Sequence, residues 1–497
     1  MDDIFSDYFQ YNSTKDIEGL SKTPAAIWQQ LGEQKALENF QIIAKAVPAY
    51  KDFLKKHSIN PEDIKTIEDF KKIPPTNKEN YFKSYPLNDL LMGGNLHHSS
   101  VIHYSSGSSG KSFFWPKTKT QDLASYKGME MLYKIYFDLG KVNNLFINCY
   151  GMGPWTAAEM VHSATKMMAE KDLKISIISP GTNQELFFEI FQGLADQFDQ
   201  IIIGGYSSFL RDLVHEGVKR GIDFRRYKIK LLSGGEKYSE NWRQFMTQHL
   251  GLKDPYKSVA AVLGSSEVGV GAISTPFVDY MRIFLASDEV AAQKLFKRSD
   301  LPSLVQYIPP ARHIEIIDGN IVITSMGNIP LVRYDTKDSG QIYSVEEFLS
   351  AIPDSCKEDY LALKEDVGIP NLPILAIHGR ADKTIILFGA NIYPEQLTYI
   401  AELPELDKYL TGRFFAEKAE TEDADVFFRL VLELKNGIVP SDQIKNEIST
   451  HLVKYLAEVN SEYAHILGSV GSKAKPKIEL REYASDNFMS ASGKNKV

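Results

Sequence analysis

The feature that most restricts the fold is a regular alternation of short β-rich runs and helix-length segments in the middle of the chain. The runs occupy residues 145–150, 174–179, 200–205, 227–233 and 256–263, and periodic segments long enough for helices lie between them. Strand, helix and strand at this spacing predict βαβ units and a largely parallel sheet. Ligands of such sheets bind where loops leave the carboxyl ends of the strands, so we look for site residues there.

The regions on either side of this alternation differ in texture. Residues 1 to about 100 predict helices and connectors, and residues 313–325 alternate around an Asp-Gly-Asn turn that is typical of an antiparallel hairpin. Strand-like and helix-like segments alternate again after Arg380. We therefore predict an α/β fold with two domains. A large N-terminal domain of βαβ-wound sheets would span residues 1–380, and a small mobile α+β domain would span residues 381–497.

Length and charge restrict the classes of protein. The chain has 497 residues, and 56 Lys and Arg against 64 Asp and Glu give a net charge of −8. This balance provides no overall attraction to nucleic acid or to an anionic membrane, so we expect neither as a partner. Cys149 and Cys356 cannot form a disulfide framework, and neither a secretory signal nor an apolar run of membrane-span length is present. These features predict a cytoplasmic protein.

A loop rich in glycine and serine is the sharpest motif. Residues 105–111 read Ser-Ser-Gly-Ser-Ser-Gly-Lys directly after a short strand-like run. Glycines permit close backbone approach, so successive N–H groups, hydroxyls and the lysine could bind phosphate. A Walker A loop is disfavoured because Ser105 stands at its first glycine position. An amidase-like hydrolase with Ser108 or Ser109 as nucleophile and a flexible linker are the other interpretations.

Further motifs follow along the chain. They are Ser-Gly-Gly-Glu-Lys at 233–237, Leu-Gly-Ser-Ser-Glu-Val-Gly at 263–269, Arg-Tyr-Asp-Thr-Lys-Asp-Ser-Gly at 333–340, His-Gly-Arg-Ala-Asp-Lys at 378–383, and Ser-Gly-Lys-Asn-Lys-Val at the C-terminus. In this order and spacing they resemble the adenylate-forming superfamily of acyl- and aryl-CoA ligases, most closely its phenylacetate-CoA ligase-like branch. The resemblance extends from about residue 40, with Phe-Lys-Lys-Ile-Pro-Pro-Thr-Asn-Lys-Glu-Asn-Tyr in the N-terminal region, to the end of the chain.

The resemblance implies a nucleotide site. The residues that would hold the ATP phosphates are Ser105, Ser106, Gly107, Ser108, Ser109, Gly110 and Lys111. Those that would contact adenine and ribose are Gly234, Gly235, Glu236, Asp338 and Arg380. Asp335 and Lys337 depart from the family, which more usually has Arg and Gly at these positions of the ribose motif.

The resemblance also implies the catalytic groups. Glu267 would bind Mg²⁺, and a hard cation does prefer carboxylate and phosphate oxygens. Lys494 would bridge the carboxylate substrate and the α-phosphate, where its ammonium would offset negative charge in the transition state. Lys496 is the alternative lysine. Asp382 would be the hinge about which the small domain rotates.

Loops at the strand ends would line the pocket for the acid. The residues that the resemblance implies are Tyr150, Gly151, Trp155, Tyr206, Gly264, Ser265 and Ser266. Aromatic side chains here suit a flat or apolar acid. The alternative is that Trp155 and the nearby Phe209 are core aromatics.

The predicted function is therefore ATP-dependent activation of an aromatic or other apolar carboxylic acid as acyl-AMP, with release of pyrophosphate, followed by transfer to a thiol. The implied cofactors are ATP, Mg²⁺ and coenzyme A as co-substrate. A carrier-protein thiol or an amine could replace coenzyme A, and dimers in the branch make a homodimer possible. Two other hypotheses stay open, namely an amidase-like serine hydrolase and a nucleotide-binding relative without catalysis.

Overall fold

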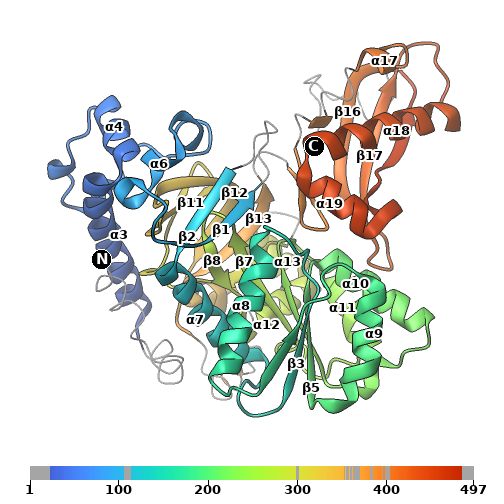
Figure 1. Cartoon of the computed structure of the whole chain (residues 1–497), viewed down its shortest axis with the longest axis horizontal. Coiled ribbons are helices and arrows are strands. Elements are labelled where there is room, and N and C mark those ends of the chain that lie inside the picture. Colours follow the sequence, from blue (N-terminus) through green and yellow to red (C-terminus); the bar gives the residue numbers. More distant parts are fainter. Residues whose placement is uncertain are drawn as a thin grey trace.

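The computed structural model describes residues 23–105, 113–297, 301–351, 353, 357–358, 361, 370–380, 384–393, 396–397 and 403–483. Its largest element is a sheet of eleven strands in the order β10-β11-β12-β13-β9-β8-β7-β6-β5-β3-β4. Helices cover this sheet, and a smaller unit built from the last part of the chain lies beside it (Figure 1). None of the described helices is long and apolar enough to cross a membrane.

One half of the large sheet is parallel, as the alternating runs predict. Its strands are β3 (Asn144–Asn148), β4 (Ile175–Ile178), β5 (Gln200–Gly205), β6 (Ile229–Gly234) and β7 (Val259–Ser265). The helices between them are α8 (Thr156–Glu170), α9 (Gln184–Leu194), α10 (Ser207–Lys219) and α11 (Glu240–Leu250). Every residue of β3 and β5 is buried, which explains their continuous apolar sequences.

The other half of the sheet is antiparallel, so the prediction of a largely parallel sheet is correct for only one half. Its strands are β8 (Gly269–Ile273), β9 (Ser303–Gln306), β10 (His313–Ile317), β11 (Asn320–Ser325), β12 (Leu331–Tyr343) and β13 (Ile374–Arg380). Only residues 266–268 separate β7 from β8, which is too short for a crossover helix, and β8 therefore returns antiparallel to β7. The predicted hairpin at 313–325 is β10 paired with β11.

Helices of the N-terminal region pack against the antiparallel half. They are α3 (Ala25–Ala46), α4 (Pro48–Lys56), α5 (Ile67–Phe70) and α6 (Leu87–Leu90). Buried aromatic side chains such as Phe40, Phe53 and Phe82 join them to one core with strands β10 to β12. A hairpin of β1 (Ser99–Ser105) and β2 (Phe113–Thr118) leads to α7 (Lys119–Tyr136). Helices α12 (Pro276–Ser287), α13 (Glu289–Phe296) and α14 (Val345–Ser350) complete the described part of this region.

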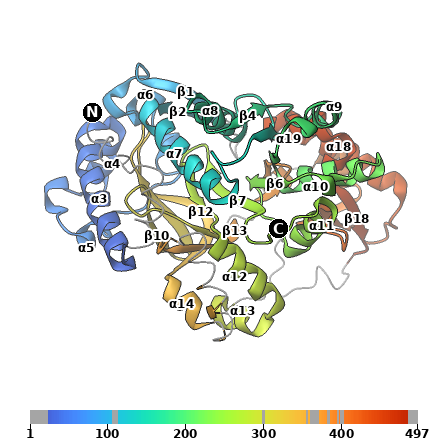
Figure 2. The same cartoon turned by 90° about the horizontal axis from the view of Figure 1, so that it is seen from below.

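The C-terminal unit has its own sheet, β16-β17-β18, and a short hairpin, β14-β15. The strands are β14 (Ile385–Leu387), β15 (Ala390–Ile392), β16 (Leu410–Glu420), β17 (Val426–Leu434) and β18 (Lys477–Arg481), and the helices are α17 (Pro404–Asp407), α18 (Asp442–Val459) and α19 (Ser461–Val470). In Figure 2 this unit lies beside α10 and α11. Strand β16 is not among the predicted strands, because charged residues interrupt its few buried positions. The domain boundary between residues 380 and 381 stays a prediction.

Candidate functional site

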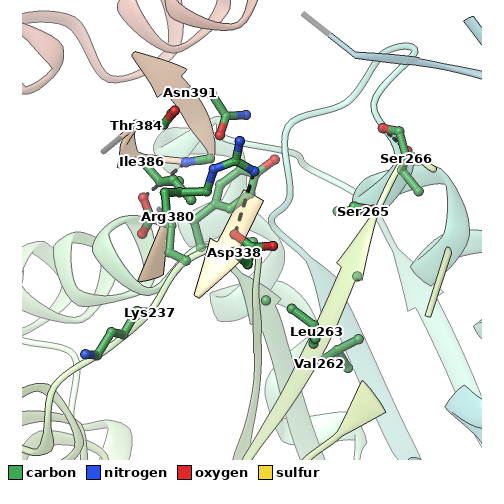
Figure 3. A pocket seen from close by; sticks show the side chains of 18 of the residues that line it. Lys237, Val262, Leu263, Ser265, Ser266, Asp338, Arg380, Thr384, Ile386 and Asn391 are labelled. Carbon is green, nitrogen blue, oxygen red and sulfur yellow. Dashed lines mark hydrogen bonds and ion pairs between the residues drawn. The ribbon is translucent and has the colours of Figure 1, made fainter. Parts of the chain in front are cut away.

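A cavity of about 880 Å³ lies at the carboxyl ends of the parallel strands. The loops after β3, β5, β6 and β7 all contribute to its wall, as the parallel sheet predicts. Strands β12 and β13 and the C-terminal unit close other sides. In Figure 3, Thr384, Ile386 and Asn391 of the C-terminal unit gather near Arg380, and Ser265 and Ser266 lie across the cavity.

The cavity brings most of the predicted site residues together. Those that line it are Ser105, Tyr150, Trp155, Tyr206, Gly234, Gly235, Glu236, Gly264, Ser265, Ser266, Glu267, Asp338 and Arg380. Gly151 adjoins it, beside His465 of α19. Ser106, Gly107, Ser108, Ser109, Gly110, Lys111, Asp382 and Lys494 lie outside the described residues. The roles of the phosphate loop, the hinge and the terminal lysine therefore stay predictions.

Glu267 presents an ionised carboxylate to the cavity from the turn between β7 and β8. The carboxylate accepts a hydrogen bond from the Tyr334 hydroxyl at 3.1 Å and forms an ion pair with Lys78 Nζ at 3.2 Å. Burial alone would raise the pKa of Glu267, but the charge of Lys78 and local hydrogen bonds hold this pKa at about 2. The group is thus negative at neutral pH, which is the state that a metal ligand requires.

Lys78 is a site residue that the sequence motifs do not assign. It comes from the N-terminal connector, where Thr76 pairs with Tyr334 of β12 in a parallel bridge. This bridge carries Lys78 to Glu267, although the two residues are far apart in sequence. Burial opposes the charged form of Lys78, yet the attraction of Glu267 raises the pKa of the lysine above its usual value. The sequence signal that could have indicated Lys78 is the Thr-Asn-Lys-Glu-Asn segment, which resembles the N-terminal region of the phenylacetate-CoA ligase-like branch.

Lys117 binds the backbone of the turn between β7 and β8 that carries Glu267. Its side chain is almost fully buried, and its Nζ donates a hydrogen bond to the backbone oxygen of Glu267 at 2.7 Å. Burial, helped by the nearby charge of Arg312, lowers the pKa of Lys117 to about 7. Arg312 itself donates to the backbone oxygen of Val268 at 2.9 Å. The side chains of Lys117 and Arg312 therefore hold the backbone at Glu267 and Val268 in place.

Replacing Lys117 with methionine is expected to remove a pH dependence of stability. Between about pH 7 and the ordinary lysine pKa of ~10.4, the unfolded chain binds a proton at this position that the folded chain has lost. As the pH rises through this window, the unfolding free energy of the wild type should therefore increase by roughly 1 to 4 kcal/mol more than that of Lys117→Met. Urea unfolding at pH 7, 8.5 and 10 measures the difference, and Lys119→Met at an exposed neighbouring position is the control. A difference that does not change with pH would contradict the prediction.

Asp338 and Arg380 face each other across two paired strands. They are register partners in the antiparallel pair of β12 and β13, and Arg380 Nη1 lies 3.7 Å from Asp338 Oδ1 (Figure 3). Both side chains are partly exposed to the cavity. Lys337 has φ of +64°, in the left-handed region that favours glycine, and its Nζ lies 2.7 Å from Asp335. The two departures from the ribose motif thus pair with each other.

Two glycines, the last residue of β6 and the first residue after it, lie beside tyrosine side chains. A Cβ at Gly235 would lie 3.0 Å from the ring of Tyr206, and one at Gly234 would lie 3.3 Å from the Tyr150 hydroxyl. Tyr150 and Tyr206 contact each other edge to face, with ring centroids 5.2 Å apart. The glycines therefore leave the backbone of this turn close to the cavity. The carboxylate of Glu236 is instead taken up by Ser207, Ser208 and the N–H of Gly389.

Aromatic and aliphatic side chains form a large part of the cavity wall. The Trp155 ring lies 5.3 Å from that of Tyr104 and 6.0 Å from that of His465. Met129, Met160, Val161, Leu232 and Val262 also line the cavity. Trp155 is thus a cavity residue, whereas Phe209 is fully buried in the core. No group of three or more His, Cys, Asp or Glu side chains that could hold a metal ion occurs in the described ranges.

Comparisons with known proteins agree with this geometry. A scan against models of protein families finds no match. The chain is 22% identical over 436 residues to a phenylacetate-coenzyme A ligase of Thermus thermophilus. The alignment covers 85% of this chain and 88% of that protein. It is 22% identical to a phenylacetate-coenzyme A ligase of Pseudomonas putida, over 76% of this chain and 77% of that protein.

Solved structures have the same fold. A 2-hydroxyisobutyryl-CoA ligase, crystallised with 2-HIB-AMP and CoA, aligns with a TM-score of 0.63 at 14% identity, over 96% of this chain and 90% of that chain. An open conformation of the same ligase aligns with a TM-score of 0.53 at 15% identity, over 96% and 92% of the two chains. These comparisons confirm the predicted resemblance: the chain is similar in sequence to phenylacetate-CoA ligases and has the fold of a solved CoA ligase.

Proposed function

We propose that this protein is an AMP-forming acid–thiol ligase that activates a carboxylic acid with ATP and transfers the acyl group to coenzyme A. One observation carries the proposal. The ionised Glu267, the Asp338–Arg380 pair and apolar side chains that include Trp155 all line one cavity. The cavity therefore offers polar groups for a nucleotide, a carboxylate for a metal ion and apolar side chains for an apolar acid.

The nucleotide would lie along the strand ends. Asp338 would accept hydrogen bonds from the ribose hydroxyls, and the backbone of Gly234 and Gly235 would approach the adenine. Residues 105–111 and Lys78 would hold the phosphates. Glu267 fits a Mg²⁺ ion, because its carboxylate is ionised at the wall of the cavity, and the ion would neutralise phosphate charge when bound.

In the first half-reaction, a carboxylate oxygen of the acid attacks the α-phosphorus of ATP, and the bond to pyrophosphate breaks. Lys494 would stabilise the charge that develops on the α-phosphate. In the second half-reaction, the sulfur of the thiol attacks the carbonyl carbon of acyl-AMP, and AMP leaves. Rotation of the C-terminal unit about Asp382 would separate the two steps.

The acid and the acceptor are the finer parts of the proposal. The apolar side chains of the cavity wall favour an aromatic or other apolar acid. Coenzyme A is favoured over a carrier-protein thiol or an amine, because the curated relatives and the solved ligase named above are all CoA ligases. The homodimer and the cytoplasmic location stay predictions.

Pyrophosphate release tests the proposal. We expect ATP-dependent release with one or more members of a panel of aromatic and fatty acids, and a mass spectrum of the products should contain an acyl-CoA. Incubations with phosphopantetheinylated carrier protein or with amines distinguish the other acceptors. No acid-dependent release together with no ATP binding would overturn the proposal. ATP-independent amide hydrolysis, with labelling by a serine-directed probe, would favour the hydrolase instead.

A further inference from the structure

A polar contact surface joins the C-terminal unit to the region around α10. On the side of the large sheet, this surface consists of Arg211, Asp212, Glu236 and Ser239, which we call the docking seat. The C-terminal unit contributes Gly389, Lys418, Glu420, Asp423, Asp425 and Lys473. Because the contacts are polar and directional, they fix an orientation more than they supply apolar binding energy.

Glu236 connects three parts of the chain. Its side chain is fully buried and accepts hydrogen bonds from Ser207 and Ser208 at the start of α10. It also accepts a bond from the N–H of Gly389 at 3.1 Å and lies 3.5 Å from Lys418 Nζ. Gly389 belongs to the turn between β14 and β15. Glu236 thus ties this turn of the C-terminal unit to the loops at the strand ends.

The turn held by Glu236 forms part of the cavity wall. Gly389 has φ of +83°, and a Cβ there would lie 2.3 Å from the ring of Tyr206. Only glycine permits this close approach of the backbone to the ring. The C-terminal unit is therefore seated directly against Tyr206, which the sequence motifs place in the acid pocket.

Two neighbouring charges on α10 set the register of the contact. Arg211 and Asp212 are 4% and 2% exposed. Arg211 donates to the backbone oxygen of Asp423 at 2.9 Å and to the Asp425 carboxylate at 3.2 Å. Asp212 forms an ion pair with Lys473 at 2.6 Å. Arg211 and Asp212 also lie 3.7 Å from each other, so a shifted orientation would keep this buried pair but remove the partner that each has in the C-terminal unit.

The same orientation brings α19 to the acid end of the cavity. The Tyr104 hydroxyl lies 3.2 Å from Ser461 Oγ, and His465 and Ile466 line the cavity near Trp155. Burial lowers the pKa of His465, so its ring is neutral at neutral pH. Within the described part of the C-terminal unit, the lysine that lines the cavity is Lys418, and it is paired with Glu236. Glu417 and Glu462 line the cavity from the same unit, and α19 encloses the end near Trp155, an enclosure that would keep water from acyl-AMP while a thiol attacks.

We propose that Arg211, Asp212 and Glu236 are positioning residues that hold the C-terminal unit in the orientation for thiol transfer. The inference rests on the proposed two-step function and adds to it the contacts that stabilise one of the two orientations. Loss of the contact between Asp212 and Lys473 should therefore slow the second half-reaction and leave the first intact, because neither residue lines the cavity.

Charge reversal at Lys473 tests this inference. Lys473 is on the surface side of the contact, so Lys473→Asp should fold. We expect acid-dependent ATP–pyrophosphate exchange within about twofold of the wild type, and CoA-dependent release of AMP from preformed acyl-AMP slower by at least about tenfold. The variant Lys473→Arg, which keeps the positive charge opposite Asp212, should retain transfer near the wild-type rate. Lys475→Asp, an exposed position two residues away, is the matched control and should behave as the wild type.

The outcomes separate the seat from the proposed function. Equal loss of both half-reactions in Lys473→Asp, unchanged transfer in that variant, or an equal loss of transfer in Lys473→Arg would each overturn the seat. Failure of the wild type to catalyse any acid-dependent exchange would instead overturn the proposed function. In that case small-angle X-ray scattering decides on the seat. Lys473→Asp should then have a larger radius of gyration than the wild type, and Lys473→Arg should not; equal radii in all three would overturn the inference.

Discussion

Replacing Lys494 with alanine is expected to reduce acid-dependent pyrophosphate exchange by about 10³-fold while ATP still binds. The near-terminal lysine of the family motif would bridge the substrate carboxylate and the α-phosphate. Its ammonium acts on charge that is concentrated in the transition state, so its removal should lower the rate constant much more than the affinity for ATP. Exchange of labelled pyrophosphate measures the rate, and calorimetry measures ATP binding.

The chain provides a matched control two residues further on. Lys496→Ala removes the same type of side chain from the same C-terminal segment, and we expect exchange within about twofold of the wild type. If Lys496→Ala loses exchange and Lys494→Ala does not, the roles of the two lysines must be interchanged. If neither variant is affected, the terminal lysine is not part of the adenylation site.

Replacing Glu267 with glutamine is expected to reduce the same exchange by about 10²- to 10³-fold and to raise the Mg²⁺ concentration needed for half-maximal rate. Glutamine keeps the shape of the side chain and can still accept the bond from Tyr334, but it removes the charge that pairs with Lys78. The variant therefore separates the charge of Glu267 from its packing. Titration of the exchange rate with Mg²⁺ gives both quantities.

Glu79→Gln is the control for Glu267→Gln. Glu79 also lines the cavity and also pairs with a lysine, Lys83, but it lies on the N-terminal connector and is largely exposed. We expect this substitution to leave the Mg²⁺ dependence unchanged. An equal effect of the two substitutions would mean that general negative potential in the cavity, and not a ligand at position 267, determines the response to Mg²⁺.

The sequence motifs predict the part of the site that depends on local order along the chain. Glycines and acidic residues directly after predicted strands, such as Gly234 and Glu267, reach the cavity because parallel strands end at one edge. Lys78 could not be placed in this way, since its position depends on a bridge between Thr76 and Tyr334. The partners of Glu236 depend on how the C-terminal unit docks, which no local pattern encodes.

In the fold, too, the elements set by local sequence are predictable and those set by long-range contacts are not. The βαβ alternation predicts the parallel strands, because each unit closes locally through its own helix. The antiparallel half is only partly predicted, since its order places strands from distant parts of the chain next to each other. Strand β16 was missed because its few buried positions, such as Phe414 and Ala416, lie between the charged residues Arg413 and Glu417.

Strand β13 has a further consequence for how the protein is made. It is the last strand of the large sheet to be synthesised, yet it lies inside the sheet, hydrogen-bonded to β12 on one side and to β9 on the other. On the ribosome, β9 and β12 cannot be joined until residues 374–380 have emerged, so the sheet closes late and over long sequence separations. A shortened version of the protein that ends before Ile374 would leave both neighbouring strands with open edges and should aggregate.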